Sequence, residues 1–136
     1  MTQHNGGVKF ILLIHNNPEA LDGLTPEQRQ ALVGGRTVVD QVRRLRERGE
    51  LVSVLALHEP SDSKTVQTVG GTPVISDRPF LETKEFLAGA VVVECPTMER
   101  ALEIAAEIPY ATVQRIEVCP IRNLEEECLA DLDQGE

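Results

Sequence analysis

The sequence predicts a single α+β domain, and three observations support this class. The chain has 136 residues, of which 41% are hydrophobic, enough for one packed core. Short apolar runs alternate along it with segments that carry hydrophobic residues at helical spacing. Two of the apolar runs, residues 8–14 and 87–94, are almost free of polar side chains, as expected of central strands covered on both faces.

The first half of the chain is predicted to contain a strand, a helix and a second strand. The strands are residues 8–14 (VKFILLI) and 51–57 (LVSVLAL). Between them, Thr25 and Gln28 have the spacing of a capping box, and Pro26 suits the first helical position. This helix is expected to bury one face, which consists of Ala31, Gly35, Val38, Val39, Val42 and Leu45.

Glycine and arginine mark the middle and the end of this predicted helix. Gly34 and Gly35 interrupt it, each at a cost of about 1 kcal/mol relative to alanine. Arginines at 43, 44, 46 and 48 crowd its last turns, where cations complement the helix dipole, and Gly49 ends it. Because the net charge is −9 and the dipole explains this basic cluster, we expect no nucleic-acid ligand.

The second half of the chain is predicted to begin with a hairpin. Its arms are residues 64–69 and 72–76, joined by Gly70-Gly71, and Pro73 makes the second arm an edge. The apolar strand 87–94 follows, then a helix capped by Thr97 and a last strand at 113–119. The predicted buried face of that helix consists of Met98, Ala101, Leu102, Ala105 and Ile108.

Without the hairpin, this order of elements is the split βαβ pattern of a ferredoxin-like fold. The fold places strands 8–14 and 87–94 at the centre of an antiparallel sheet and both helices on one of its faces. The other face is still apolar in its central strands and needs a cover. A second copy of the chain is the simplest cover, so we expect a homodimer with two-fold symmetry.

Composition also suggests the compartment and the cofactors. No apolar run approaches the ~20 residues of a membrane span, and the first residues do not resemble a secretion signal. We therefore expect a cytoplasmic protein without membrane association. Cys95, Cys119 and Cys128 form no C-x-x-C motif and are expected to be reduced, the first two as small buried hydrophobes. No metal-ligand or nucleotide-binding motif occurs, so no cofactor is expected.

The densest polar segment, residues 77–85 (DRPFLETKE), leaves the hairpin and enters a central strand. It resembles the DGPFAETKE signature of a branch of the YCII-related family, and the likeness extends from the VKFILLI strand to Glu117-Val118. Arg78 and Leu81 depart from the signature. The resemblance implies a ferredoxin-like fold that dimerises through its sheets as a dimeric α/β barrel, a small-molecule pocket with a histidine–aspartate pair, and genes that lie beside extracytoplasmic-function sigma factors.

The candidate catalytic pair is Asp77 with His58, which ends the second strand at the rim of an apolar face. His15 ends the first strand in the same way and is a second candidate base. The residues expected to bind a ligand are His15, Arg78, Phe80, Glu82, Lys84 and Glu85. The simpler interpretation is that residues 77–85 form a solvated turn with local ion pairs and that both histidines are merely polar.

Three functions fit the sequence. The first is an acid–base enzyme of the lyase, isomerase or dehalogenase type, which acts on a small organic molecule in a pocket between the sheet and the hairpin. The second is a non-catalytic ligand-binding protein or regulatory partner of a sigma factor. The third is a purely structural dimer.

Residues 1–122 are predicted to form the domain and residues 123–136 an acidic tail. Leu124, Cys128 and Leu132 recur every four residues and Asn123 is an acceptable cap, so residues 123–132 are predicted to form a short amphipathic helix. Such a helix is expected to pack on the domain or on the partner subunit, with residues 133–136 frayed. A disordered acidic tail is the alternative.

Overall fold

The computed structural model describes residues 7–33, 35–77, 85–108, 111 and 114–134. Its strands are β1 (Val8–Asn16), β2 (Leu51–Ala56), β3 (Lys64–Val69), β4 (Thr72–Asp77), β5 (Phe86–Cys95) and β6 (Ile116–Pro120). Its α-helices are α1 (Pro26–Val33), α2 (Gly35–Glu47), α3 (Met98–Glu107) and α4 (Leu124–Gln134). Single 3-10 turns occur at Pro18–Leu21 and Pro60–Asp62.

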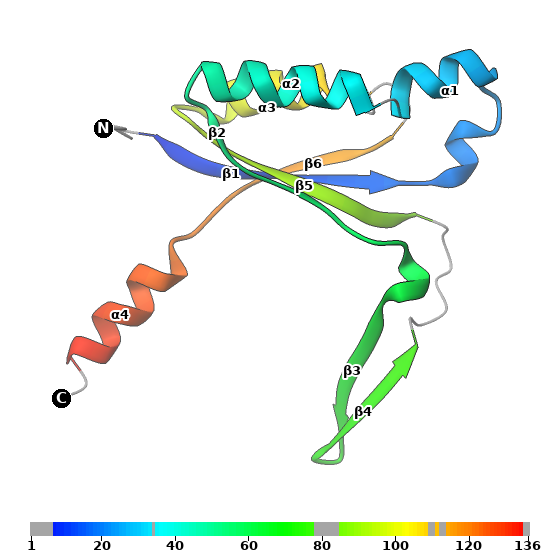
Figure 1. The fold of residues 1–136 in the computed structure, drawn as a ribbon. Coiled ribbons are helices and arrows are strands. Elements are labelled where there is room, and N and C mark those ends of the chain that lie inside the picture. The colour runs from blue at the N-terminus through cyan, green and yellow to red at the C-terminus, as the bar shows by residue number, and fades with distance from the viewer. Residues whose placement is uncertain (1–6, 34, 78–84, 109–110, 112–113, 135–136) are drawn as a thin grey trace.

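Four strands form one antiparallel sheet in the order β2-β5-β1-β6, and β3 and β4 form a separate two-stranded sheet. The strands that are richest in apolar residues, β1 and β5, are central, as their composition predicts. Helices α1, α2 and α3 all lie on one side of the four-stranded sheet (Figure 1). The fold is therefore α+β and ferredoxin-like, with an inserted hairpin, as the order of elements predicts.

The core lies between this sheet and helices α2 and α3. Leu12 and Val93 of the central strands are fully buried, as is Ile104 of α3, and Leu45 of α2 is 2% exposed. The start of α3 is fixed by residues close together in the sequence, because Thr97 Oγ1 accepts the backbone N–H of Arg100. Burial of these four large side chains contributes about 1.5–3 kcal/mol each.

The opposite face of the sheet, which we call the open face, is not covered by any helix in Figure 1. Residues that pair across antiparallel strands point to the same face. The register pairs Ile11 with Val92, Leu13 with Ala90, and Ala90 with Leu55. Leu55 is 54% exposed. The apolar side chains of the open face are those of Ile11, Leu13, Leu55, Ala90, Val92 and Cys119. The pairing of Leu13 with Glu117 and of Val92 with Ser53 places two polar residues on the same face.

Two arms leave the sheet on the side of the open face, the β3–β4 hairpin and α4 (Figure 1). The hairpin turns at Gly70 and Gly71, whose φ angles of 57° and 81° are those of a two-residue turn that favours glycine. Its apolar side chains remain exposed, with Val66 at 66% and Ile75 at 72%. A two-stranded ribbon of this kind is only marginally stable by itself.

The structure corrects the helix predicted between the first two strands. The described residues form two helical segments, α1 to Val33 and α2 from Gly35, and Gly34 between them lies outside the described residues. The expected buried face is partly wrong, because Ala31 is exposed and Val38 and Val39 are 39% and 48% exposed. Leu45 of that face is buried as predicted, and Gln41, which was not part of it, is buried as well.

Three smaller predictions are wrong as well. Ala101, Ala105 and Ile108 are buried as predicted, but Leu102 is 51% exposed, and Ile104 of α3 is buried in its place. The last strand begins at Ile116. Gln114 lies before it and is buried, and its side-chain amide is hydrogen-bonded to Asn16 and Asn17. Cys95 is buried as expected, but Cys119 is exposed on the open face.

The tail forms the predicted helix. Asn123 Oδ1 accepts the N–H of Glu126 at 2.9 Å, so the expected cap is confirmed. The helix continues to Gln134 instead of fraying from residue 133. Its leucines remain largely exposed in the described part of the chain, with Leu124 at 60% and Leu132 at 68%. Docking on the chain's own domain is therefore wrong, and docking on a partner stays a prediction.

Candidate functional site

A histidine–carboxylate pair lies on the open-face side of the sheet, where β1 ends. His15 Nε2 is 2.6 Å from Glu117 Oε1, and the His15 side chain is only 16% exposed. A bulge between Ile14 and His15 shifts the register with β5 at this point. The backbone N–H of His15 donates to the carbonyl of Arg115 at 3.0 Å, which fixes the strand end that carries the imidazole.

Two further charged residues complete this group, which we call the His15 cluster: His15, Glu85, Arg115 and Glu117. Arg115 lies between the two carboxylates, with Nη2 at 2.5 Å from Glu85 Oε1 and Nη1 at 3.1 Å from Glu117 Oε1. The hydrogen bond from Arg115 lowers the pKa of Glu85, and the bond to Glu85 raises the pKa of Arg115. Glu85 is therefore an anion at neutral pH.

The geometry assigns different roles to the two nitrogens of His15. An ionised carboxylate only accepts hydrogen bonds, so Nε2 carries the proton that is donated to Glu117. In the neutral ring this leaves the lone pair on Nδ1. That atom is 3.9 Å from Glu85 Oε1, beyond hydrogen-bonding distance. A histidine oriented in this way by a carboxylate is arranged to accept a proton through its other nitrogen.

The sequence predicted part of this cluster. His15 and Glu85 were candidate ligand-binding residues, but Arg115 and Glu117 were not candidates. The sequence of β6 does mark Glu117, because this charged residue stands between the apolar Ile116 and Val118. A single charged residue on a strand is ordinarily solvated, so the pattern alone does not distinguish it.

The predicted pair of Asp77 and His58 has other partners in the structure. Asp77 is 87% exposed and forms an ion pair with Lys64 across the hairpin. His58 is 91% exposed, and its Nδ1 is 3.5 Å from Asp62 Oδ2. The pairing of these two residues in catalysis stays a prediction. Arg78, Phe80, Glu82 and Lys84 lie outside the described residues.

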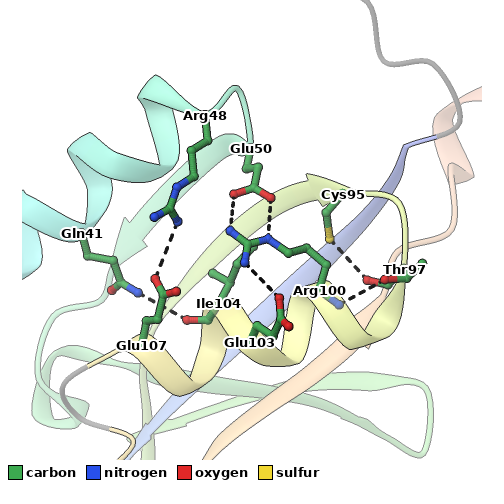
Figure 2. Close-up of polar contacts among 9 residues, drawn as sticks. All are labelled: Gln41, Arg48, Glu50, Cys95, Thr97, Arg100, Glu103, Ile104 and Glu107. Atoms are coloured by element: carbon green, nitrogen blue, oxygen red, sulfur yellow. Dashed lines mark hydrogen bonds and ion pairs between the residues drawn. The ribbon is translucent and has the colours of Figure 1, made fainter.

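An apolar cavity lies between the sheet and helices α2 and α3, with a volume of about 240 Å³. Its described lining is apolar except for Asn16 and Gln41, and Gln41 is 6% exposed. Gln41 Nε2 donates to the carbonyl of Ile104 at 3.3 Å (Figure 2). A second cavity of about 290 Å³, at the base of the hairpin, is lined in part by His58, Phe86 and Leu87.

A second polar cluster joins the start of β2 to α3 on the helix side of the sheet. Arg100 donates to both oxygens of Glu50 at 2.8 Å and to Glu103 at 3.0 Å (Figure 2). Near it, Cys95 Sγ is 3.5 Å from the carbonyl of Thr97, and burial raises the pKa of this thiol. Burial therefore keeps the Cys95 thiol protonated at neutral pH.

Neither a metal centre nor a membrane span is found in the part of the chain that the structure describes. Its histidines, cysteines and carboxylates form no group of three or more that is suited to a metal ion. None of its helices has the length and apolar character to span a bilayer.

The fold and the His15 cluster define a small ferredoxin-like α+β protein with a histidine–carboxylate pair at one end of its open sheet face. Within that class, the chain belongs to the YCII-related family, whose domain model matches residues 8–125. It is also 26% identical over 102 residues to an uncharacterized protein of Rhizobium meliloti (strain 1021), across 75% of this chain and 81% of that relative. Membership of the DGPFAETKE branch stays a prediction.

Proposed function

We propose that the protein is a homodimeric enzyme that performs acid–base chemistry on a small organic molecule, with His15 as the general base. The observation that carries this proposal is the 2.6 Å contact between His15 Nε2 and Glu117 Oε1 on a side chain that is largely shielded from water. Glu117 orients the ring and stabilises the imidazolium that forms when Nδ1 accepts a proton.

The dimer is part of the proposal because the open face is apolar and both arms lie on its side of the sheet. Packing two open faces buries Leu13, Leu55 and Val92 of each copy and removes an exposed apolar patch. The substrate site then lies next to His15, at the edge of the interface.

A proton-abstraction reaction can be tested before its product is known. The protein is incubated in D₂O with a panel of small organic acids, lactones and halogenated acids, and carbon-bound deuterium is measured by mass spectrometry. We expect exchange into one compound class with the wild type, none with His15→Gln and a reduced rate with Glu117→Gln. The control is His58→Gln, because the structure places that exposed ring against Asp62. Full exchange by His15→Gln would disprove the assignment.

The apolar cavity favours a second candidate, a ligand-binding protein without catalysis. Its described lining contains no titratable side chain, only Asn16 and Gln41 among apolar neighbours. Such a site binds a small apolar molecule with one polar group. A thermal-shift screen of the same panel distinguishes the two functions, since this candidate predicts stabilisation by a compound that does not exchange deuterium.

A further inference from the structure

Helix α4 carries an apolar stripe that stays largely exposed among the residues that the structure describes. Leu124, Cys128 and Leu132 share one face, with Leu129 beside them, and the three leucines are 51–68% exposed. Eleven residues form a marginal helix in water unless the stripe is buried. The rest of the helix is acidic, with three glutamates, two aspartates and no basic residue.

A groove of complementary character lies between α2 and the edge strand β2. It has a volume of about 350 Å³ and an apolar floor of valines, with arginine at its margin. Its lining is Val38, Val39, Val42, Arg43, Arg46 and Val54. These valines include two of the side chains that the α2 sequence pattern predicts to be buried and that the structure leaves exposed. Arg43 also bonds to Asp40 of its own helix at 3.1 Å, and Arg46 is exposed.

The helix and the groove lie on opposite sides of the sheet within one chain. Figure 1 shows α2 on the helix side and α4 projecting from the open face. In a dimer packed through the open faces, α4 of one copy points toward the partner's sheet and the helices beyond it. The eleven residues span about 16 Å, whereas two packed sheets are separated by about 10 Å. The helix is thus long enough to extend past the edge of the partner's sheet, toward its helix layer.

We infer that α4 of each subunit docks in the α2–β2 groove of a second copy of this chain. Its leucines cover Val38, Val39 and Val54, and its carboxylates face Arg43 and Arg46. The inference rests on the proposed homodimer and goes beyond it. Because the groove shares Val38, Val42 and Val54 with the apolar cavity, the docked helix becomes an outer wall of the partner's cavity. Each cavity is then complete only in the dimer.

Charge reversal in trans tests this arrangement. The helix variant is Asp131→Lys with Asp133→Lys, near the end of α4, where lysine suits the helix dipole. The groove variant is Arg43→Glu with Arg46→Glu. Alone, each variant should self-associate about tenfold more weakly than the wild type. When the two are mixed, both docking sites of the heterodimer regain opposite charges, so native mass spectrometry should show heterodimer above its binomial proportion.

The matched control is Arg44→Glu with Arg48→Glu, which makes the same charge change on the same stretch of chain outside the groove. Mixed with the helix variant, it should give the binomial proportion. If the control and the helix variant formed as much excess heterodimer as the groove and helix variants do, net charge would explain the effect and the inference would be overturned. Binomial mixing of both pairs, with a dimeric wild type, would overturn α4 docking and leave the sheet dimer intact. A monomeric wild type would overturn both.

Discussion

Arg100 binds Glu50 with two parallel hydrogen bonds, from Nε and Nη2 to the two carboxylate oxygens, each at 2.8 Å. The Glu50 side chain is 15% exposed. These hydrogen bonds lower the pKa of Glu50, because an adjacent guanidinium favours the ionised carboxylate. The pair joins the turn before β2 to the first turns of α3, two elements that enclose the core.

The first prediction is that Glu50→Gln lowers the free energy of unfolding at pH 7 by about 1–3 kcal/mol. The folded-state pKa of Glu50 is depressed, so its stabilisation is present above the unfolded-state pKa of about 4.3 and is lost as the pH falls through the folded value. The difference from the wild type, measured by urea unfolding, should shrink below about pH 4. Glu103→Gln is the control, since Glu103 is a 66% exposed partner of the same arginine.

The second prediction concerns the pairing of β2 with β5. A Cβ added at Gly89 would lie 2.5 Å from the backbone oxygen of Leu55, which cannot move without disturbing the ladder. Gly89→Ala should therefore destabilise the protein by about 2 kcal/mol or more, measured by thermal or urea unfolding. A Cβ added at Gly23 meets open space, so Gly23→Ala should leave the stability nearly unchanged. Equal stability of the two variants would show that β2 is not held as described.

A third prediction tests the dimer interface with two leucines of similar exposure. Leu55 on the open face is 54% exposed, and Leu102 on the outer side of α3 is 51% exposed. Leu55→Glu should convert the dimer to monomers, because the interface would bury an unpaired charge, while Leu102→Glu should leave association unchanged. Sedimentation at micromolar concentration gives the readout. A dimeric Leu55→Glu variant would show that the open face is not the interface.

The fourth prediction concerns the charges around His15. Arg115→Gln removes the cation that lowers the pKa of Glu85, so this pKa should move upward toward the ordinary value for glutamate. Carbon-13 NMR titration of the Glu85 carboxyl measures the change. Lys64→Gln removes a comparable exposed cation at the hairpin and should not affect Glu85. An unchanged Glu85 pKa in Arg115→Gln would mean that the ion pair is absent in solution.

Much of the fold was predictable from residues close together in the chain. Thr25 and Gln28 bond to each other's backbone N–H, as their capping-box spacing indicates, and Gly70 and Gly71 adopt the positive φ angles that a two-residue turn requires. The apolar runs of β1 and β5 identified the central strands. These features depend on local hydrogen bonds and on burial of whole strands, which spacing and composition record directly.

The site was predicted only in part, because its contacts join distant parts of the chain. His15 and Glu117 are 102 residues apart, and their contact depends on the register of β1 against β6. The pattern also placed Val38 and Val39 in the core, although the angle at which α2 packs leaves them in a groove. Periodicity identifies an apolar side chain without indicating which surface covers it.

The sequence by itself determined the order of the elements, their caps and turns, and the apolar character of both faces of the central strands. Only the tertiary structure decided that Glu117 orients His15, that Arg100 holds Glu50, and that α4 leaves the sheet on the side away from α2. The physical reason is that caps and turns involve atoms a few residues apart. Ion pairs between strands and the placement of a helix depend instead on register and packing angle, which the whole chain sets together.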